Sequence, residues 1–128
     1  MIGIDTSALI AILRKEDRAA DCRDVIGAAS EILIAAPILT EALVVAAGYE
    51  LQGEMGLLIS GLSLTVVPLS EDLAYAALRA YVEWGKGRHP ARLNIMDSFS
   101  YALAKERDCA LLFIGDDFSK TDIRSALT

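Results

Sequence analysis

The sequence has few of the residues that define secreted, disulfide-rich or zinc-binding proteins. Its two cysteines, Cys22 and Cys109, are too few for a disulfide framework, and no second Cys or His stands at zinc-ligand spacing from either. A chain of 128 residues can bury most of its apolar surface without disulfides or a structural metal. We therefore expect a single domain over residues 1–128 that works in a reducing, cytoplasmic setting.

The sequence also lacks a hydrophobic run that could cross a membrane. The uncharged stretch from Met55 to Ser70 is shorter than the about 20 apolar residues a spanning helix needs, and glycines and Pro68 interrupt it. A signal peptide is not expected either, because Asp5 lies in the apolar N-terminus and the first basic residues follow it. Hydrophobic residues still make up 54% of the chain, a high share that predicts a protein partner or self-association.

The sequence has fewer basic than acidic residues. The chain has 12 Lys and Arg against 18 Asp and Glu, a formal net charge of −6. Such a chain repels nucleic acid unless its basic residues are concentrated or bound cations reverse the local field.

Short apolar segments alternate with helical patterns along the whole chain, and no repeat or linker divides it. Strands that are apolar on both faces and separated by helices indicate an α/β fold with a parallel sheet covered on both sides. We expect strands at residues 1–4, 31–35, 64–68 and 110–114. We expect helices running to residue 13, over 18–29, over 37–47, over 57–62, over 70–82 and from 94 or 95 to about 105.

Acidic residues lie where these strands end. In parallel sheets, ligands bind beyond the carboxyl ends of the strands. Asp5 follows the first strand, Glu41 lies a helical turn after the second, and Asp116 and Asp117 follow the last. Asp97, in the first turn of the helix before the last strand, can reach the same edge. Each acid taken alone could equally be a helix cap or a partner of the helix dipole.

Together, these acids predict a site for a hard cation. Carboxylates that cluster without solvent repel one another unless they share protons or bind cations. Oxygen ligands without convergent His or Cys favour Mg²⁺ or Mn²⁺ over zinc. Such a site supports phosphodiester hydrolysis, in which the metal activates water and stabilises the developing charge.

Three blocks carry a resemblance to a known family: IGIDTSALIAIL at 2–13, RHPARLNIMDSFSYALA at 88–104 and LLFIGDDFSKTDI at 111–123, with ILTEALVV between them. In this order they resemble the PIN-domain ribonucleases, in particular the VapC toxins of type II toxin–antitoxin pairs. The resemblance implies a PIN-like α/β fold with a central parallel sheet of four or five strands flanked by helices on both faces. It also implies an endoribonuclease that uses Mg²⁺ or Mn²⁺, an RNA substrate, a cognate antitoxin that inhibits it, and assembly as a homodimer and as a toxin–antitoxin hetero-oligomer.

The resemblance also suggests roles for individual residues. Asp5 and Asp97 are similar to the principal metal ligands, Glu41 to the family's glutamate and Asp117 to the fourth acid, so these four are the candidate catalytic residues. The remaining candidates are Asp116 as a further ligand and three polar residues, Thr6, Ser7 and Thr121, that support the acids or phosphate.

A basic loop lies just before the helix of Asp97. Residues 85–92 contain Lys86, Arg88 and Arg92, which we expect to contact RNA phosphates and so to give affinity rather than base identity. His89 has the chemistry of a general acid, but the following Pro90 favours a role in shaping the loop. The aromatic residues of the preceding helix fit core or interface packing better than base stacking.

Three other functions remain open from the sequence. A phosphoaspartyl phosphatase-like enzyme normally needs a second acid two residues after the first, and Ser7 stands there instead. A non-catalytic PIN-fold binding module would gain nothing from a full acidic set. DNA cleavage stays open, because the same metals hydrolyse either backbone and recognition of the 2′-hydroxyl is not visible in the sequence.

An apolar region at 49–62 is a candidate partner surface, with core packing as the alternative.

Overall fold

A four-stranded parallel sheet, with strand order β3-β2-β1-β4, forms the centre of the protein. The computed structural model describes residues 1–127. The strands are β1 (Ile2–Ile4), β2 (Ile32–Ala35), β3 (Thr65–Val67) and β4 (Ala110–Leu112). The helices are α1 (Thr6–Leu13), α2 (Ala19–Ala28), α3 (Ala36–Gly48), α4 (Gln52–Leu62), α5 (Glu71–Trp84) and α6 (Ile95–Glu106), followed by the 3₁₀ turn η1 (Phe118–Lys120).

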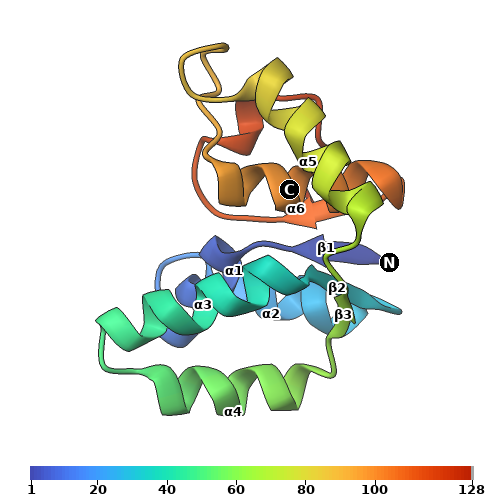
Figure 1. Cartoon of the computed structure of the whole chain (residues 1–128). Helices are drawn as coiled ribbons and strands as arrows, with labels where there is room; N and C mark the ends of the chain where they lie inside the picture. The colour runs from blue at the N-terminus through green and yellow to red at the C-terminus, as the bar shows by residue number, and fades with distance from the viewer. Residues whose placement is uncertain (128) are drawn as a thin grey trace.

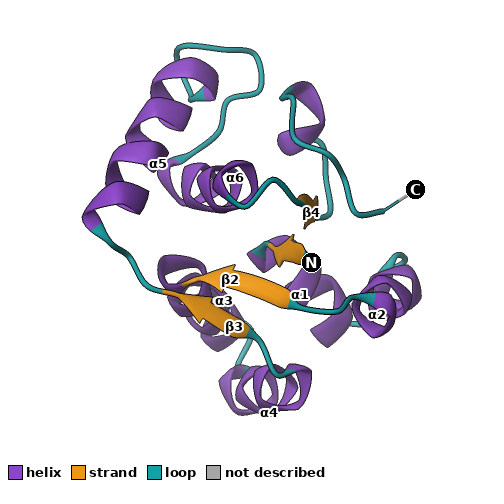
Figure 2. Cartoon of the chain, turned by 90° about the vertical axis from the view of Figure 1, so that its right-hand side faces the viewer, coloured by secondary structure: helices purple, strands orange, loops and turns teal. Residues whose placement is uncertain are grey.

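Helices cover both faces of this sheet, as predicted. Figure 2 shows α5 and α6 on one side of the strands and α1, α2 and α4 on the other, while α3 packs against α1 and α4. The chain moves outward from β1 to β2 and β3, then returns through α5 and α6 to place β4 on the other side of β1 (Figure 1). The strand order therefore reverses beside β1, and in such sheets a crevice opens at the carboxyl end of the strand where this happens.

The C-terminal segment extends the sheet beyond β4. The Leu111 N–H donates to the Arg124 carbonyl and the Ala126 N–H donates to the Leu111 carbonyl, each at 2.9 Å. This single parallel bridge between Leu111 and Ser125 covers the edge of β4. The expected number of strands, four or five, agrees with four strands and one added bridge.

Most element boundaries differ from the prediction by one or two residues, and the ends of β4 and α4 differ for identifiable reasons. The last strand ends at Leu112 rather than at residue 114, because the Ile114 N–H donates to the Ser7 hydroxyl and not to a strand partner. Helix α4 begins at Gln52 rather than at residue 57. Gly53 and Gly56 weaken the helical signal there, but burial of Met55 against the core overrides that local preference.

The apolar region at 49–62 divides between the core and the surface. Met55 is fully buried, whereas Leu57 is 77% exposed and Tyr49 lies under the Arg14 guanidinium, 4.1 Å from the ring centroid. A second exposed apolar set lies on α5 and at the start of α6, including Leu78 and Ile95. Among residues 1–127, none of the helices combines the length and the apolar character needed to cross a bilayer.

The loop between α5 and α6 is closed at its base by a short bridge. The Leu93 N–H donates to the Trp84 carbonyl at 3.1 Å and the Lys86 N–H donates to the Leu93 carbonyl at 2.9 Å. Gly85 lies inside this bridge, and a Cβ placed on it would stand 2.2 Å from the Tyr81 carbonyl oxygen. Only glycine therefore lets α5 end here and the loop begin.

We predict that Gly85→Ala lowers the free energy of unfolding by about 2 kcal/mol, because backbone atoms must shift to admit the methyl group. Gly56→Ala is the matched control, since a Cβ at that helical position meets nothing within 4 Å. That variant should gain up to about 1 kcal/mol from helix propensity. Urea unfolding of both variants checks this, and equal stabilities would contradict the steric assignment.

Candidate active site

Asp5 is a buried carboxylate at the carboxyl end of β1. Its side chain is 5% exposed and caps the N-terminus of α1, where its Oδ2 accepts from the Ser7 N–H at 3.1 Å and from the Ser7 hydroxyl at 2.7 Å. Its Oδ1 accepts from the Ser100 hydroxyl of α6 at 2.7 Å. Among residues 1–127 no Lys or Arg forms an ion pair with Asp5. Hydrogen bonds and the start of α1 therefore stabilise its charge.

Glu41 reaches the same place from α3. The Thr6 hydroxyl, at the start of α1, donates to Glu41 Oε1 at 2.5 Å. Burial raises the pKa of Glu41 above its ordinary value, the bond from Thr6 opposes that rise, and the negative charge of Asp5 adds to it. Glu41 thus lies within electrostatic reach of Asp5.

Asp97 lies at the start of α6 and forms a capping box with Asn94. Its N–H donates to Asn94 Oδ1 at 2.8 Å, and its own Oδ2 accepts from the Asn94 N–H at 3.0 Å. The pKa of Asp97 is raised from 3.8 to about 7. Burial is the main cause, the hydrogen bond from the Asn94 N–H opposes the rise, and the charges of Asp5, Asp117 and Glu41 contribute to it. Three carboxylates from three other segments therefore act on Asp97.

The two neighbouring acids after β4 differ in position. Gly115, with φ of +102°, turns the chain away from the strand, and both Asp116 and Asp117 are exposed. The charge of Asp117 raises the pKa of Asp97, whereas Asp116 is not among the carboxylates that do so. Asp116 lines a separate hollow with Arg18 and Ser125. Of the five predicted acids, Asp5, Glu41 and Asp117 act electrostatically on Asp97, and Asp116 does not.

The three predicted supporting residues lie in two different places. Thr6 and Ser7 both contact the acids, and the Ser7 hydroxyl also accepts the Ile114 N–H at 3.0 Å, which ties the end of β4 to Asp5. Thr121 instead stabilises the C-terminal turn. Its hydroxyl donates to the Phe118 carbonyl at 2.7 Å and accepts the Ile123 N–H at 3.2 Å. No bond of Thr121 to an acid is seen among the described residues.

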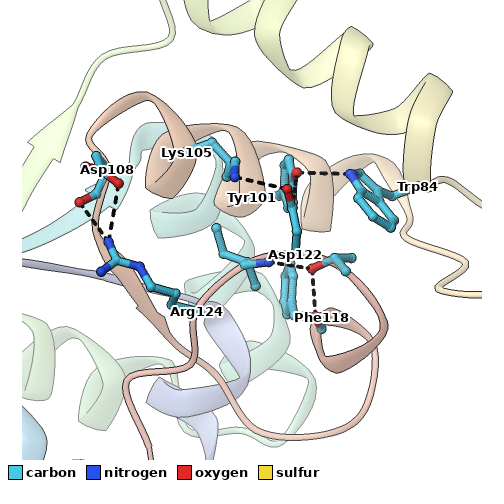
Figure 3. Close-up of polar contacts among 9 residues, drawn as sticks. Trp84, Tyr101, Lys105, Asp108, Phe118, Asp122 and Arg124 are labelled. Atoms are coloured by element: carbon cyan, nitrogen blue, oxygen red, sulfur yellow. Dashed lines mark hydrogen bonds and ion pairs between the residues drawn. The ribbon is translucent and has the colours of Figure 1, made fainter.

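A polar chain fixes this C-terminal turn to α6. Figure 3 shows the Trp84 indole N–H donating to the Tyr101 hydroxyl, which in turn donates to Asp122. Lys105 forms an ion pair with the other oxygen of Asp122 at 3.1 Å. The hydrogen bond from Tyr101 is the main cause that lowers the pKa of Asp122. These polar contacts hold the segment that follows Asp117 against α6, the helix that carries Asp97.

The basic loop leads directly into α6 and encloses an open hollow of about 500 Å³, lined by Lys86, Gly87, Arg88, His89, Pro90 and Arg92. In residues 1–127 none of its three Lys and Arg side chains forms an ion pair. His89 has a role in shaping the loop, as predicted, since its Nδ1 accepts the Ala91 N–H at 2.9 Å and its ring meets Trp84 edge-on at 4.6 Å. The cationic side chains are thus left exposed on a braced loop.

Comparison with known proteins identifies the family of this chain. The family model described as "PIN domain" matches residues 2–124. The chain belongs to the PIN-domain family.

Curated relatives and solved structures agree with this membership. The chain is 36% identical to ribonuclease VapC42 of Mycobacterium tuberculosis, covering 98% of each chain, and 42% identical to ribonuclease VapC30 of the same species, covering 94% of each. The crystal structure of the M. tuberculosis toxin VapC20 matches all of both chains with a TM-score of 0.80 at 16% identity. A toxin–antitoxin complex from Klebsiella pneumoniae matches with a TM-score of 0.73 at 18% identity, over 95% of this chain and 93% of that one. The resemblance to VapC ribonucleases and the PIN-like fold are therefore confirmed.

The donor set of this PIN domain fits a hydrated Mg²⁺ or Mn²⁺ ion. Its candidate ligands are Asp and Glu side chains, which offer oxygen atoms. Within residues 1–127 no three Asp, Glu, His or Cys side chains are grouped so that they could hold a metal ion together. Mg²⁺ usually keeps several waters and binds through one or two carboxylates, so a partly open arrangement suits it. A divalent cation would also offset the repulsion that raises the pKa of Asp97.

One contact of the site was missed from the sequence. Ser100 bonds Asp5 directly, yet its only signal was its place one helical turn after Asp97. A serine inside an amphipathic helix gives no other sign of such a role. Among the described residues, the hydroxyl of Ser98, the other buried serine of α6, bonds only the carbonyl of Asn94, the N-cap residue of that helix.

We predict that Asp97→Asn stabilises the metal-free protein above pH 7. Between its unfolded pKa near 4 and its folded pKa of about 7, folded Asp97 keeps a proton that the unfolded chain has lost, so stability falls as pH rises through this window. Three pKa units correspond to about 4 kcal/mol. We expect about 2 kcal/mol because the side chain is partly exposed.

Urea unfolding in EDTA from pH 4 to pH 8 tests this expectation. The advantage of Asp97→Asn should shrink towards pH 4, and Asp116→Asn, outside the cluster, should follow the wild-type profile. A residual fall from Glu41 is expected in every variant. Parallel curves for the wild type and Asp97→Asn would contradict the assigned burial and repulsion.

Proposed function

We propose that this PIN domain is an endoribonuclease toxin that hydrolyses RNA phosphodiesters at a carboxylate-bound Mg²⁺ or Mn²⁺ site. The observation that carries the proposal is that three acids from three other segments act on the buried Asp97, with no ion pair to Asp97 among the described residues. Partly buried carboxylates that repel one another destabilise the fold unless a bound cation offsets their charge. Relatives along nearly the full chain are named ribonucleases, which supports RNA over DNA as the substrate.

Asp5 and Asp97 are the residues that would hold the ion, with Asp117 as the acid completing the site. When bound, a divalent ion activates water and stabilises the charge that develops at phosphorus. Both oxygens of Asp5 already accept hydrogen bonds, which disfavours its use as a phosphorylated nucleophile. Asp116 ranks below Asp117 as a ligand because it stands apart from the cluster.

Glu41 would accept the proton of the attacking water. Thr6 binds Glu41 Oε1, and Oε2 has no partner among the described residues. Burial and the charge of Asp5 raise the pKa of Glu41, which makes it a better base than an exposed glutamate. Thr6 thus orients the carboxylate and leaves one oxygen for the proton.

The basic loop would bind the RNA backbone. Lys86, Arg88 and Arg92 lie just before the helix that carries Asp97, so they would hold phosphates next to the acids. Their charge would offset the repulsion between an acidic protein and RNA.

We further propose that a cognate antitoxin inhibits the enzyme in the cytoplasm, in a hetero-oligomer built on a homodimer. The exposed apolar side chains on α3 and α4 and those on α5 and α6 give two surfaces that protein partners would cover. A structural neighbour is itself a toxin–antitoxin complex. The free, buried Cys22 and Cys109 fit a reducing compartment.

We predict that Asp5→Asn and Asp97→Asn each lower the rate of RNA cleavage at least 100-fold, because each removes a charge that holds the metal. Asp116→Asn is the matched control and should keep activity within about threefold. EDTA should stop the wild-type reaction and Mn²⁺ should restore it. The measurement is the cleavage rate of a labelled RNA, with circular dichroism to verify folding.

Cleavage that persists in either variant would overturn the site assignment. Activity in chelator would point to a metal-free mechanism. A folded wild type that binds no Mn²⁺ and cleaves no RNA would favour the non-catalytic binding module instead.

We predict that Lys86→Ala and Arg88→Ala each weaken RNA binding and lower the slope of log Kd against log salt by about 1, as expected when one phosphate contact is lost. Arg23→Ala, an exposed arginine on α2, is the control and should leave the slope unchanged. Binding is measured in EDTA so that cleavage does not interfere. Equal slopes for all variants would exclude the loop from the RNA interface.

A further inference from the structure

Ser100 forms a buried contact with Asp5 across the fold. The two residues are 95 positions apart, Ser100 is 1% exposed, and its hydroxyl donates to Asp5 Oδ1 at 2.7 Å. Buried hydroxyls inside a helix commonly bond a carbonyl of their own helix, as Ser98 does with Asn94. The Ser100 hydroxyl instead donates to the carboxylate of Asp5, the N-cap residue of α1.

The bond from Ser100 restrains the oxygen of Asp5 that Ser7 does not contact. Ser7 donates twice to Oδ2 of Asp5, from its N–H and from its hydroxyl. Among the described residues Ser100 is the one partner of Oδ1. The two bonds to Oδ2 already resist rotation about the Cβ–Cγ bond of Asp5, and the bond from Ser100 adds a restraint on the second oxygen from a different helix. One lone-pair direction of Oδ1 then stays available for a ligand.

Ser100 also links Asp5 to Asp97. It lies three residues after Asp97 on α6, so both side chains project from the same face of one helix. Any shift of α6 would move Asp97 and the donor to Asp5 together. The relative placement of the two acids is thus coupled through a single helix.

We propose that Ser100 is a positioning residue of the active site: its hydroxyl fixes the Asp5 carboxylate in the orientation that binds a divalent cation together with Asp97. This inference rests on the proposed function. Partners of this kind typically change metal affinity by about 10-fold to 100-fold when they are removed.

The experiment compares Ser100→Ala with Ser98→Ala. Both remove a buried hydroxyl from α6, but only the first touches a carboxylate, so the pair separates a role at the site from a role in the helix. Mn²⁺ binding is measured by titration calorimetry and by the electron paramagnetic resonance of free Mn²⁺, and thermal unfolding is measured in EDTA. We expect Ser100→Ala to bind Mn²⁺ at least 10-fold more weakly than the wild type and Ser98→Ala to stay within about twofold.

The outcomes distinguish a failure of the positioning role of Ser100 from a failure of the proposed function. If the wild type binds Mn²⁺ and cleaves RNA but Ser100→Ala binds as Ser98→Ala does, the positioning role is wrong and the proposed function stands. If the folded wild type neither binds Mn²⁺ nor cleaves RNA, the proposed function fails and the inference fails with it. If Ser100→Ala does not fold, Ser100→Cys, which has nearly the same shape and is a weaker donor, replaces it. Unchanged Mn²⁺ affinity in that variant overturns the proposal, and at least fivefold weaker binding supports it.

Discussion

Repulsion between carboxylates held at one end of the sheet is the constraint around which this PIN domain is built. Asp5, Glu41, Asp97 and Asp117 come from four segments. Burial is the main cause that raises the pKa of Asp97 to about 7, and the charges of the other three acids add to that rise. The surrounding structure offsets part of this cost. Hydroxyl groups from Thr6, Ser7 and Ser100 donate to the acids, and the starts of α1 and α6 lie beside Asp5 and Asp97.

Asp5 is the centre of this arrangement, because its bonds join parts of the chain that are distant in sequence. It caps α1, it reaches α6 through Ser100, and it reaches the end of β4 through Ser7 and the Ile114 N–H. The same contacts explain why β4 stops at Leu112, since the Ile114 N–H donates to the Ser7 hydroxyl and not to a strand partner. Geometry at the acids and the boundaries of the sheet are therefore set by one network.

Contacts between α5, α6 and the C-terminal segment brace the part of the molecule that carries the acids. Trp84, Tyr101 and Asp122 form a polar chain that holds the turn after Asp117 against α6, and Trp84 also contacts His89 of the basic loop. The acids and the cationic loop are thus braced by shared residues. A negatively charged protein can in this way present local positive charge beside a site that a cation would neutralise.

The sequence by itself determined the alternation of strands and helices and the placement of acids after the strands, because periodicity and strand ends are local features and parallel strands end at one edge. It also carried the motifs by which the family was identified. The partners of the acids depended on the tertiary structure. The separation of Asp117 from Asp116 follows from the turn at Gly115, the use of Thr121 in its own turn follows from the packing of the C-terminal segment, and the bond from Ser100 to Asp5 follows from how α6 lies against β1. Such pairings depend on contacts between distant segments, which no local pattern of residues encodes.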